Sequence, residues 1–165
     1  MKRLIILRHA KAEQVPGKLD HDRALTGRGE RDARRAGTVL GGMGLVPDLV
    51  LCSPAVRTRQ TAELALAEFA PDARVYHEPE IYLAYPDDLL ALIQRTDPDV
   101  ATLLLVAHNP GSHELFLSLT GTPADDDPGF PTCAFAVVET DTSWEHLWPG
   151  EGRTAARWTP KDGRI

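Results

Sequence analysis

Three short apolar runs rich in Leu, Ile and Val constrain the fold of this chain more than any other feature. They are Leu4-Ile5-Ile6-Leu7, Leu49-Val50-Leu51 and Leu103-Leu104-Leu105-Val106. Each run is continuous rather than alternating with polar residues, which is typical of strands buried on both faces of a parallel sheet. We therefore predict buried strands over residues 2–7, 48–52 and 101–107.

Stretches with a helical spacing of apolar residues lie between and after these runs. Thr26 can cap a helix in which Ala33, Ala36 and Leu40 recur at three- and four-residue intervals. Three further helices are predicted over residues 55–69, 86–95 and 111–119. Beyond Cys133 the pattern changes, and short extended segments are predicted over residues 134–139, 145–148 and 153–158.

Buried strands that alternate with amphipathic helices predict an α/β protein. The expected architecture has three layers, α/β/α, around a mostly parallel central sheet. A chain of 165 residues is long enough to bury roughly 70% of the surface that its unfolded form exposes. We therefore predict a single domain over residues 1–165, with no internal repeat.

Composition excludes several classes of protein. The net charge of −6 argues against a nucleic-acid-binding protein, which usually needs a basic face. No apolar run approaches the roughly 20 residues needed to span a bilayer, and the N-terminus lacks the features of a signal peptide. Cys52 and Cys133 have no metal-ligand spacing and are predicted to be buried neutral thiols. We expect a cytoplasmic protein without a membrane partner, and a monomer.

Polar residues follow each of the three predicted parallel strands. Arg8 and His9 follow the first, the segment from Ser53 to Arg57 follows the second, and His108 follows the third. Ligands of such sheets bind outside the carboxyl ends of the strands. The sequence therefore predicts that two arginines and two histidines meet at one edge of the sheet.

This set of side chains suits a phosphoryl group. A neutral imidazole is a competent nucleophile near neutral pH, and we predict that His9 attacks phosphorus to give a covalent phosphohistidine. Arg8 and Arg57 can hold the phosphoryl oxygens with forked donors. His108 can donate a further hydrogen bond that strengthens in the transition state. Such a site requires no metal and no cofactor.

The remaining histidines lack such a context, and ordinary surface or core-edge roles are expected for them. They are His21, His77, His113 and His146.

The motifs that carry these residues resemble those of a known family. Leu7-Arg8-His9-Ala10-Lys11, Ser53-Pro54 to Arg57-Thr58, and Ala107-His108-Asn109 resemble the three motifs of the histidine phosphatase superfamily. The start of the chain and the closing Trp158-Thr159-Pro160-Lys161-Asp162 are most similar to the SixA-type branch, the phosphohistidine phosphatases. The resemblance implies a phosphoglycerate mutase-like fold. It also implies that His9 is the phosphorylated nucleophile and that Arg8, Arg57 and His108 complete the phosphate pocket.

This chain departs from the pattern of the family in two respects, the residue after the catalytic histidine and the identity of the proton donor. Ala10 stands where a glycine usually follows the catalytic histidine, and we expect a backbone conformation that alanine tolerates. The proton donor of larger members is a carboxylate between the second arginine motif and the second histidine, where this chain has Glu78, Glu80, Asp87 and Asp88. Of these, Glu80 is the candidate proton donor, because it precedes residues 82–85 in a loop that could cover the site.

The sequence thus predicts a metal-independent phosphatase that acts through a phosphohistidine intermediate. The expected substrate is a phosphorylated protein, such as a histidine-containing phosphotransfer domain, or a small phosphoester. If no carboxylate donates a proton to the leaving group, phosphohistidine is favoured over alkyl esters as the substrate, because the leaving imidazole has an ordinary pKa of about 6.5. A phosphomutase and a noncatalytic phosphate-binding module are the alternatives, although the module would not require a nucleophile at His9.

Overall fold

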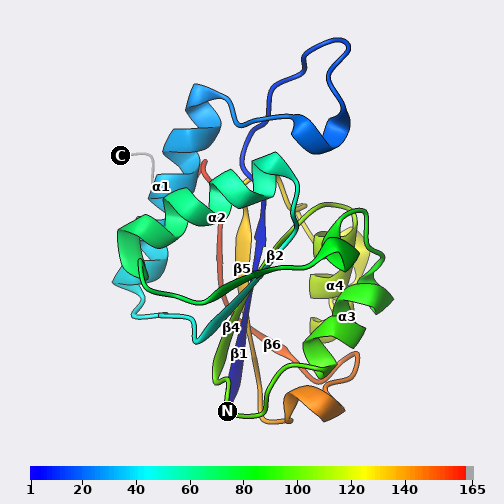
Figure 1. Ribbon diagram of the computed structural model, residues 1–165. Helices are drawn as coiled ribbons and strands as arrows, with labels where there is room; N and C mark the ends of the chain where they lie inside the picture. The colour runs from blue at the N-terminus through cyan, green and yellow to red at the C-terminus, as the bar shows by residue number, and fades with distance from the viewer. Residues whose placement is uncertain (163–165) are drawn as a thin grey trace.

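A six-stranded sheet forms the centre of the molecule in the computed structural model, which describes residues 1–162 (Figure 1). In chain order the strands are β1 (Lys2–Arg8), β2 (Leu49–Cys52), β3 (Val75–His77), β4 (Thr102–Ala107), β5 (Phe135–Thr140) and β6 (Arg153–Trp158). They lie side by side in the order β3-β2-β4-β1-β5-β6. The first four strands along the chain are parallel, whereas β5 and β6 pair in the antiparallel sense. The predicted mostly parallel sheet is confirmed.

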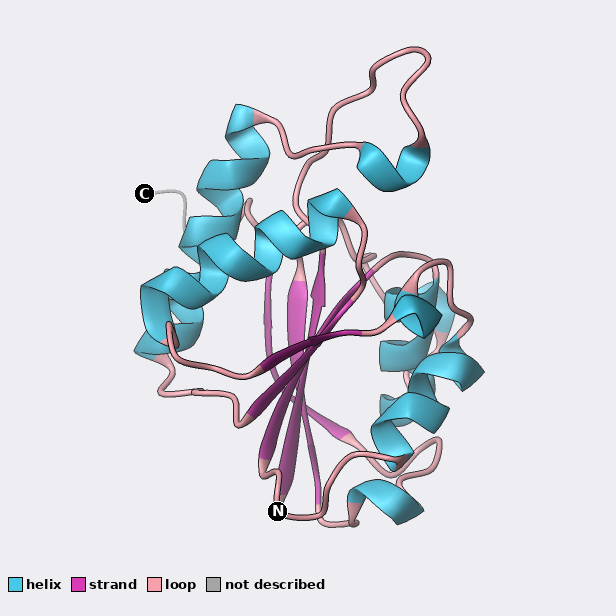
Figure 2. Ribbon diagram, in the orientation of Figure 1, coloured by secondary structure: helices cyan, strands magenta, loops and turns pink. Residues whose placement is uncertain are grey.

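Helices cover both faces of this sheet (Figure 2). Helices α1 (Gly27–Gly42) and α2 (Val56–Phe69) pack on one face, and α3 (Pro86–Gln94) and α4 (Gly111–Thr120) pack on the other. The three-layer α/β/α fold is therefore confirmed, and each of the four predicted helices is present.

The two covered faces explain the continuous apolar runs. Along β1, Leu4 and Ile6 belong to the core beneath α3 and α4. Ile5 and Leu7 belong to the core beneath α1 and α2. Because successive side chains of a strand point to opposite faces, a sheet covered on both sides needs apolar residues at every position.

The start and the packing of α1 follow from two small residues. Thr26 precedes the helix, and its hydroxyl oxygen accepts a hydrogen bond of 3.0 Å from the Gly29 N–H. The cap predicted at Thr26 is thus confirmed. Where α1 crosses α2, a β-carbon at Gly37 would lie 2.2 Å from the carbonyl oxygen of Ala65, so only glycine permits this close approach.

Two parts of the sheet region differ from the sequence-based expectations. Strand β3 is absent from those expectations, because it is a three-residue edge strand whose side chains are largely exposed. The segment over residues 145–148 is expected to be extended, but a short 3-10 helix occupies Trp144–His146. This turn buries the Trp144 indole, whose Nε1–H donates to the Val100 carbonyl over 2.7 Å.

Further properties bear on the expected class of protein. No helix within residues 1–162 has both the length and the apolar character needed to cross a membrane. The thiols of Cys52 and Cys133 are free and buried, and burial raises the pKa of each to about 12. Both are therefore neutral, as predicted. A cytoplasmic location and a monomeric state stay predictions.

Candidate active site

The carboxyl ends of β1, β2 and β4 lie next to one another because β4 pairs with both of the other strands. Arg8 at the end of β1 is in register with Ala107 at the end of β4. Beyond these ends, the His9 N–H donates to the Ala107 carbonyl over 3.1 Å, and the Ser53 N–H donates to the Val106 carbonyl over 3.1 Å. The sheet register thus brings the three polar segments to a single edge.

A cleft of about 250 Å³ opens at this edge. Arg8, His9, Arg57 and His108 all line it, so the structure brings together the four residues that the sequence singled out. The other lining residues are Lys11, Ala12, Gln14, Arg23, Leu83, Asn109 and Thr132. Cationic side chains therefore dominate a small space, which favours an anionic ligand.

His9 is held as a neutral imidazole. The residue is only 7% exposed, and its Nδ1 lies 2.8 Å from the carbonyl oxygen of Ala10. A carbonyl can only accept, so Nδ1 carries the proton and Nε2 carries the lone pair. Burial, opposed by this hydrogen bond and reinforced by the charges of Arg8 and Arg57, lowers the pKa of His9 to about 4.

His108 lies beside His9, with 5.4 Å between the ring centroids. Its Nε2 is 2.8 Å from Ser53 Oγ, so the serine hydroxyl orients the ring. Burial and the neighbouring His9 and Arg57 lower the pKa of His108 to about 3. Both imidazoles are consequently neutral at pH 7 before a ligand binds.

Arg57 is buried and is held from outside the cleft by Asp20. Its Nη1 donates to the Asp20 carbonyl over 2.7 Å, and its Nη2 donates to Asp20 Oδ2 over 3.0 Å. The Tyr82 hydroxyl donates to the same carboxylate oxygen. Hydrogen bonds from Tyr82 and Arg57 hold the pKa of Asp20 far below its ordinary value, against the opposing effect of burial. Sequence reasoning missed Asp20 and Tyr82, which no motif marks.

Arg8 is held by a neutral group instead. Its Nη1 donates to the carbonyl oxygen of Phe130 over 3.1 Å. The side chain of Asn109, immediately after His108, donates to the same carbonyl over 2.7 Å. Burial, with a smaller contribution from the charge of Arg57, lowers the pKa of Arg8. The supports of the two arginines therefore differ in charge.

Each of the two arginines has one buried nitrogen, Nε, without a hydrogen-bond partner. Within the described part of the chain, the buried side-chain polar atoms without a hydrogen-bond partner are Arg8 Nε, Arg57 Nε, His108 Nδ1, Asn109 Oδ1 and Ser112 Oγ. Buried donors are rarely left unpaired in native structures. Three of these atoms can donate and belong to residues that line the cleft, which is the arrangement expected of a site that binds an oxyanion.

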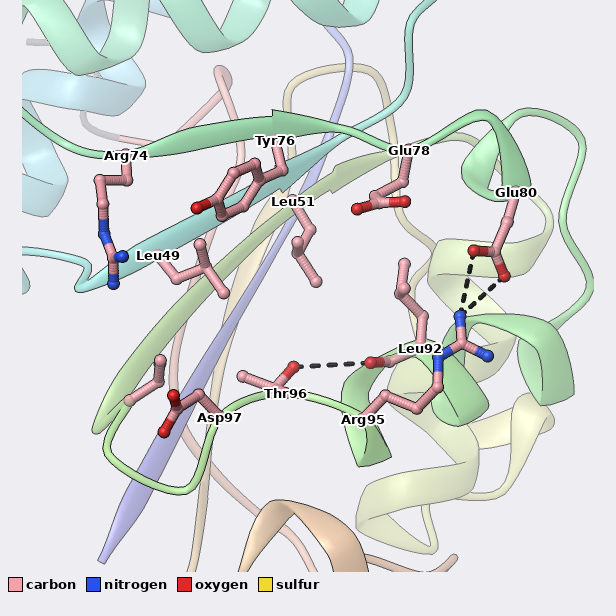
Figure 3. Close-up of a pocket in the computed structure, with 11 residues that line it drawn as sticks. Leu49, Leu51, Arg74, Tyr76, Glu78, Glu80, Leu92, Arg95, Thr96 and Asp97 are labelled. Atoms are coloured by element: carbon pink, nitrogen blue, oxygen red, sulfur yellow. Dashed lines mark hydrogen bonds and ion pairs between the residues drawn. The ribbon is translucent and has the colours of Figure 1, made fainter.

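Glu80 does not take the position expected of a proton donor. It lies in a short 3-10 helix (Pro79–Ile81), and its carboxylate oxygens accept from Arg95 Nη2 over 3.0 and 2.8 Å (Figure 3). Both residues line a separate pocket of about 440 Å³ between β3 and α3. The turn that carries Glu80 directs its side chain toward the C-terminal end of α3, and Leu83 lines the cleft instead.

Ala10 fits its position without a left-handed backbone. It is fully buried, its φ is not positive, and its N–H donates to Thr61 Oγ1 over 2.9 Å. The expectation of a conformation that alanine tolerates is confirmed.

Among residues 1–162, no group of three or more His, Cys, Asp or Glu side chains is arranged to hold a metal ion.

Comparison with known proteins identifies the class to which this fold and site belong. Residues 4–81 match the sequence model of the histidine phosphatase superfamily (branch 1). An uncharacterized protein of Mycobacterium tuberculosis is 37% identical over 151 residues, which cover 87% of this chain and 93% of that protein. An uncharacterized chloroplastic protein of Arabidopsis thaliana is 32% identical over 162 residues, covering 92% and 72% of the two chains. The chain belongs to the histidine phosphatase superfamily.

Solved structures narrow the class further. SixA from Nakamurella multipartitia has a TM-score of 0.87 and 30% identity, with 97% of this chain and 96% of that chain covered. The protein histidine phosphatase SixA in complex with tungstate has a TM-score of 0.81 and 28% identity, with 96% of this chain and 97% of that chain covered. The chain is thus of the SixA type, with a phosphoglycerate mutase-like fold, and this membership supports phosphatase activity.

Proposed function

We propose that this protein is a metal-independent phosphohistidine phosphatase that acts on a phosphorylated protein through a phosphohistidine intermediate at His9. The observation that carries the proposal is the neutral His9 imidazole, which holds its lone pair on Nε2 in a cleft shared with Arg8, Arg57 and His108. Phosphoryl transfer uses a nucleophile together with cationic donors that hold the phosphoryl oxygens, and this cleft supplies both.

The first chemical step transfers the phosphoryl group to His9. The lone pair of His9 Nε2 forms a bond to phosphorus while the bond from phosphorus to the leaving nitrogen breaks. The electron pair of that bond stays on the leaving imidazole, which takes up a proton from solvent. The hydrogen bond from His9 Nδ1 to the Ala10 carbonyl stabilises the positive charge that develops on the ring.

The second step restores the enzyme. A water molecule attacks phosphorus and releases one proton, and the electron pair of the P–N bond returns to His9 Nε2. Arg8 and Arg57 stabilise the equatorial oxygens in both steps, and His108 donates to the same oxygens. The products are inorganic phosphate and the dephosphorylated side chain.

The substrate class follows from the weak demand for a general acid. Glu80 is paired with Arg95 in another pocket, and Asp20 is held as a carboxylate by Tyr82 and Arg57. An imidazole with an ordinary pKa of about 6.5 leaves more readily than an alkoxide, so phosphohistidine suits a site without a positioned acid. The SixA relative is itself a protein histidine phosphatase, which favours a phosphorylated protein such as a histidine-containing phosphotransfer domain.

The test compares two substrates in the presence of a chelator. Wild type and His9→Ala are incubated with a phosphorylated histidine-containing phosphotransfer domain and, separately, with an aryl phosphate. We expect rapid His9-dependent loss of the protein phosphate and slow cleavage of the aryl ester.

Brisk aryl cleavage with an untouched phosphoprotein would indicate a small-molecule phosphatase instead. Full turnover by His9→Ala would contradict the covalent mechanism, and activity that chelation abolishes would contradict metal independence.

A further inference from the structure

A buried carboxylate outside the cleft holds the loop between α4 and β5. The Asp127 side chain is 2% exposed, and His113 Nε2 lies 2.6 Å from its Oδ2. The Gly129 N–H donates to the same oxygen over 3.0 Å, and Arg157 Nη1 donates to Oδ1. Burial acts to raise the pKa of Asp127, but hydrogen bonds from Arg157, His113 and Gly129 outweigh it and lower the pKa. Asp127 is therefore ionised and fully engaged.

The partners of Asp127 also enclose Phe130. The His113 ring stacks on the Phe130 ring with 6.0 Å between centroids. The Arg157 guanidinium lies 4.5 Å from the centroid of Phe116 and 5.8 Å from that of Phe130. Arg157 Nη2 also donates to the Gly129 carbonyl over 3.0 Å. We call His113, Asp127 and Arg157 the Asp127 cluster; it holds the backbone and the ring next to the Phe130 carbonyl.

The Phe130 carbonyl is the group that receives the hydrogen bonds of Arg8 Nη1 and Asn109 Nδ2. The loop is tied to the nucleophile as well, because the Cys133 N–H donates to the His9 carbonyl over 2.9 Å. An unbroken series of contacts thus leads from Asp127 through Phe130 to the guanidinium of Arg8.

We infer that Asp127, together with His113 and Arg157, is a positioning residue for the phosphate-binding arginine Arg8. The inference rests on the proposed function only in taking the cleft to bind an oxyanion. By fixing the Phe130 carbonyl, the cluster holds Arg8 through its terminal nitrogen and leaves Nε for the ligand. None of the three residues of the cluster lines the cleft, so the cluster acts through Phe130 and Arg8.

If Asp127 positions Arg8, the effect of an Asp127 substitution on oxyanion binding should depend on whether Arg8 is present. A general loss of stability would not show this dependence. Tungstate serves as the oxyanion probe, and its dissociation constant is measured by calorimetry in wild type, Arg8→Lys and Arg57→Lys, each with and without Asp127→Asn. We expect Asp127→Asn to weaken binding about tenfold in wild type and in Arg57→Lys, because misplacement of a binding group is costly. In Arg8→Lys the further loss should be less than about twofold, because the contact through which Asp127 acts is already gone.

Matched variants control for the chemical change and for folding. Asp126→Asn makes the same substitution one residue away, at an exposed position, and should leave tungstate binding unchanged. If Asp127→Asn fails to fold, Arg157→Lys replaces it, since lysine cannot donate to both Asp127 and Gly129 with the same geometry. If Arg8→Lys binds too weakly to measure, the NMR signals of the arginine Nε–H groups are compared instead. Asp127→Asn should then shift the signal of Arg8 and leave that of Arg57.

Each outcome separates the inference from the proposed function. Equal losses in all three backgrounds, an unshifted Arg8 signal, or no loss in wild type would overturn the positioning role. Failure of the wild type to bind tungstate would contradict the proposed function, whereas wild-type binding that Asp127→Asn does not weaken would contradict only the role of Asp127.

Discussion

The two arginines of the cleft are supported in different ways. Arg57 donates directly to the carboxylate of Asp20, a side chain that is 48% exposed in a short 3-10 helix (Asp20–Asp22). Arg8 donates to the neutral Phe130 carbonyl, and the carboxylate behind that carbonyl, Asp127, is 2% exposed. Arg57 is thus supported directly by a charged group at the surface. Arg8 is supported by a neutral carbonyl, and the charged group behind that carbonyl is buried.

This difference has a consequence for the electrostatics of the site. A carboxylate that pairs with an arginine offsets part of the charge available to a bound anion, whereas a carbonyl orients the arginine and leaves its charge intact. Arg8 therefore contributes a full positive charge to the cleft, and Arg57 shares its charge with Asp20. The burial of Asp127 also ties the Arg8 support to the stability of the fold.

The largest expected effect is a difference in stability between variants of Asp127 and of Asp20, the carboxylates behind the two arginines. Asp127→Asn should lower the free energy of unfolding by about 3 kcal/mol, because an amide at this buried position leaves at least one of the three donors around it without an acceptor. Asp20→Asn should cost no more than about 1 kcal/mol, because the Asp20 side chain is half exposed to solvent and Arg57 keeps its hydrogen bond to the Asp20 carbonyl. Urea denaturation of both variants measures the difference, and equal losses would contradict the contrast between the two regions.

The pH dependence of stability tests the environment of the two histidines, whose burial lowers their pKa more than the charges of the arginines do. The pKa of His9 is lowered to about 4 and that of His108 to about 3, whereas the unfolded chain titrates near 6.5. Between pH 6.5 and 4 the unfolded state thus binds more protons, so the free energy of unfolding falls as the pH falls. At His9 the difference corresponds to about 3 kcal/mol.

Denaturation curves between pH 7 and 4 measure this loss. His9→Asn, which cannot take up a proton in this range, should lose part of the acid sensitivity. A variant that remained as acid-sensitive as wild type would show that His9 is not the group that titrates.

Catalysis should be more sensitive at Arg8 than at Arg57. Arg8→Lys is expected to lower kcat/KM about 100-fold, or about 2.7 kcal/mol, because lysine cannot reproduce the forked contact. Arg57→Lys should cost less, because Asp20 already offsets part of its charge. Steady-state kinetics on a phosphorylated protein substrate measure both values, and a larger loss at Arg57 would reverse the proposed division of charge.

The smallest expected effect concerns Tyr82. Tyr82→Phe removes the hydroxyl that donates to Asp20, which should raise the pKa of Asp20 toward its ordinary value. The cost in stability should be less than about 1 kcal/mol, because the pair is partly exposed. An NMR titration of the Asp20 carboxyl group measures the pKa, with Tyr76→Phe as the control. An unchanged pKa would show that the Tyr82 hydroxyl does not stabilise the Asp20 carboxylate.

The sequence by itself determined the three buried parallel strands and the four residues predicted to do the chemistry. Continuous apolar runs indicate strands that are buried on both faces, and parallel strands deliver the residues that follow them to one edge. Arg8, His9, Arg57 and His108 can thus be grouped from the sequence, because each lies just beyond such a strand or at the start of the following helix. Strand β3 escapes this reasoning because a short, exposed edge strand has no such pattern.

The tertiary structure alone decided what surrounds these four residues. Asp20 meets Tyr82 across 62 positions of the chain, and Asp127 meets Arg157 across 30. His113, for which the sequence indicated an ordinary role, belongs to the Asp127 cluster, and Glu80 pairs with Arg95 rather than facing the cleft. Loop paths place these side chains, and loops follow from turn geometry and long-range packing, not from the periodicity of apolar residues that a sequence displays.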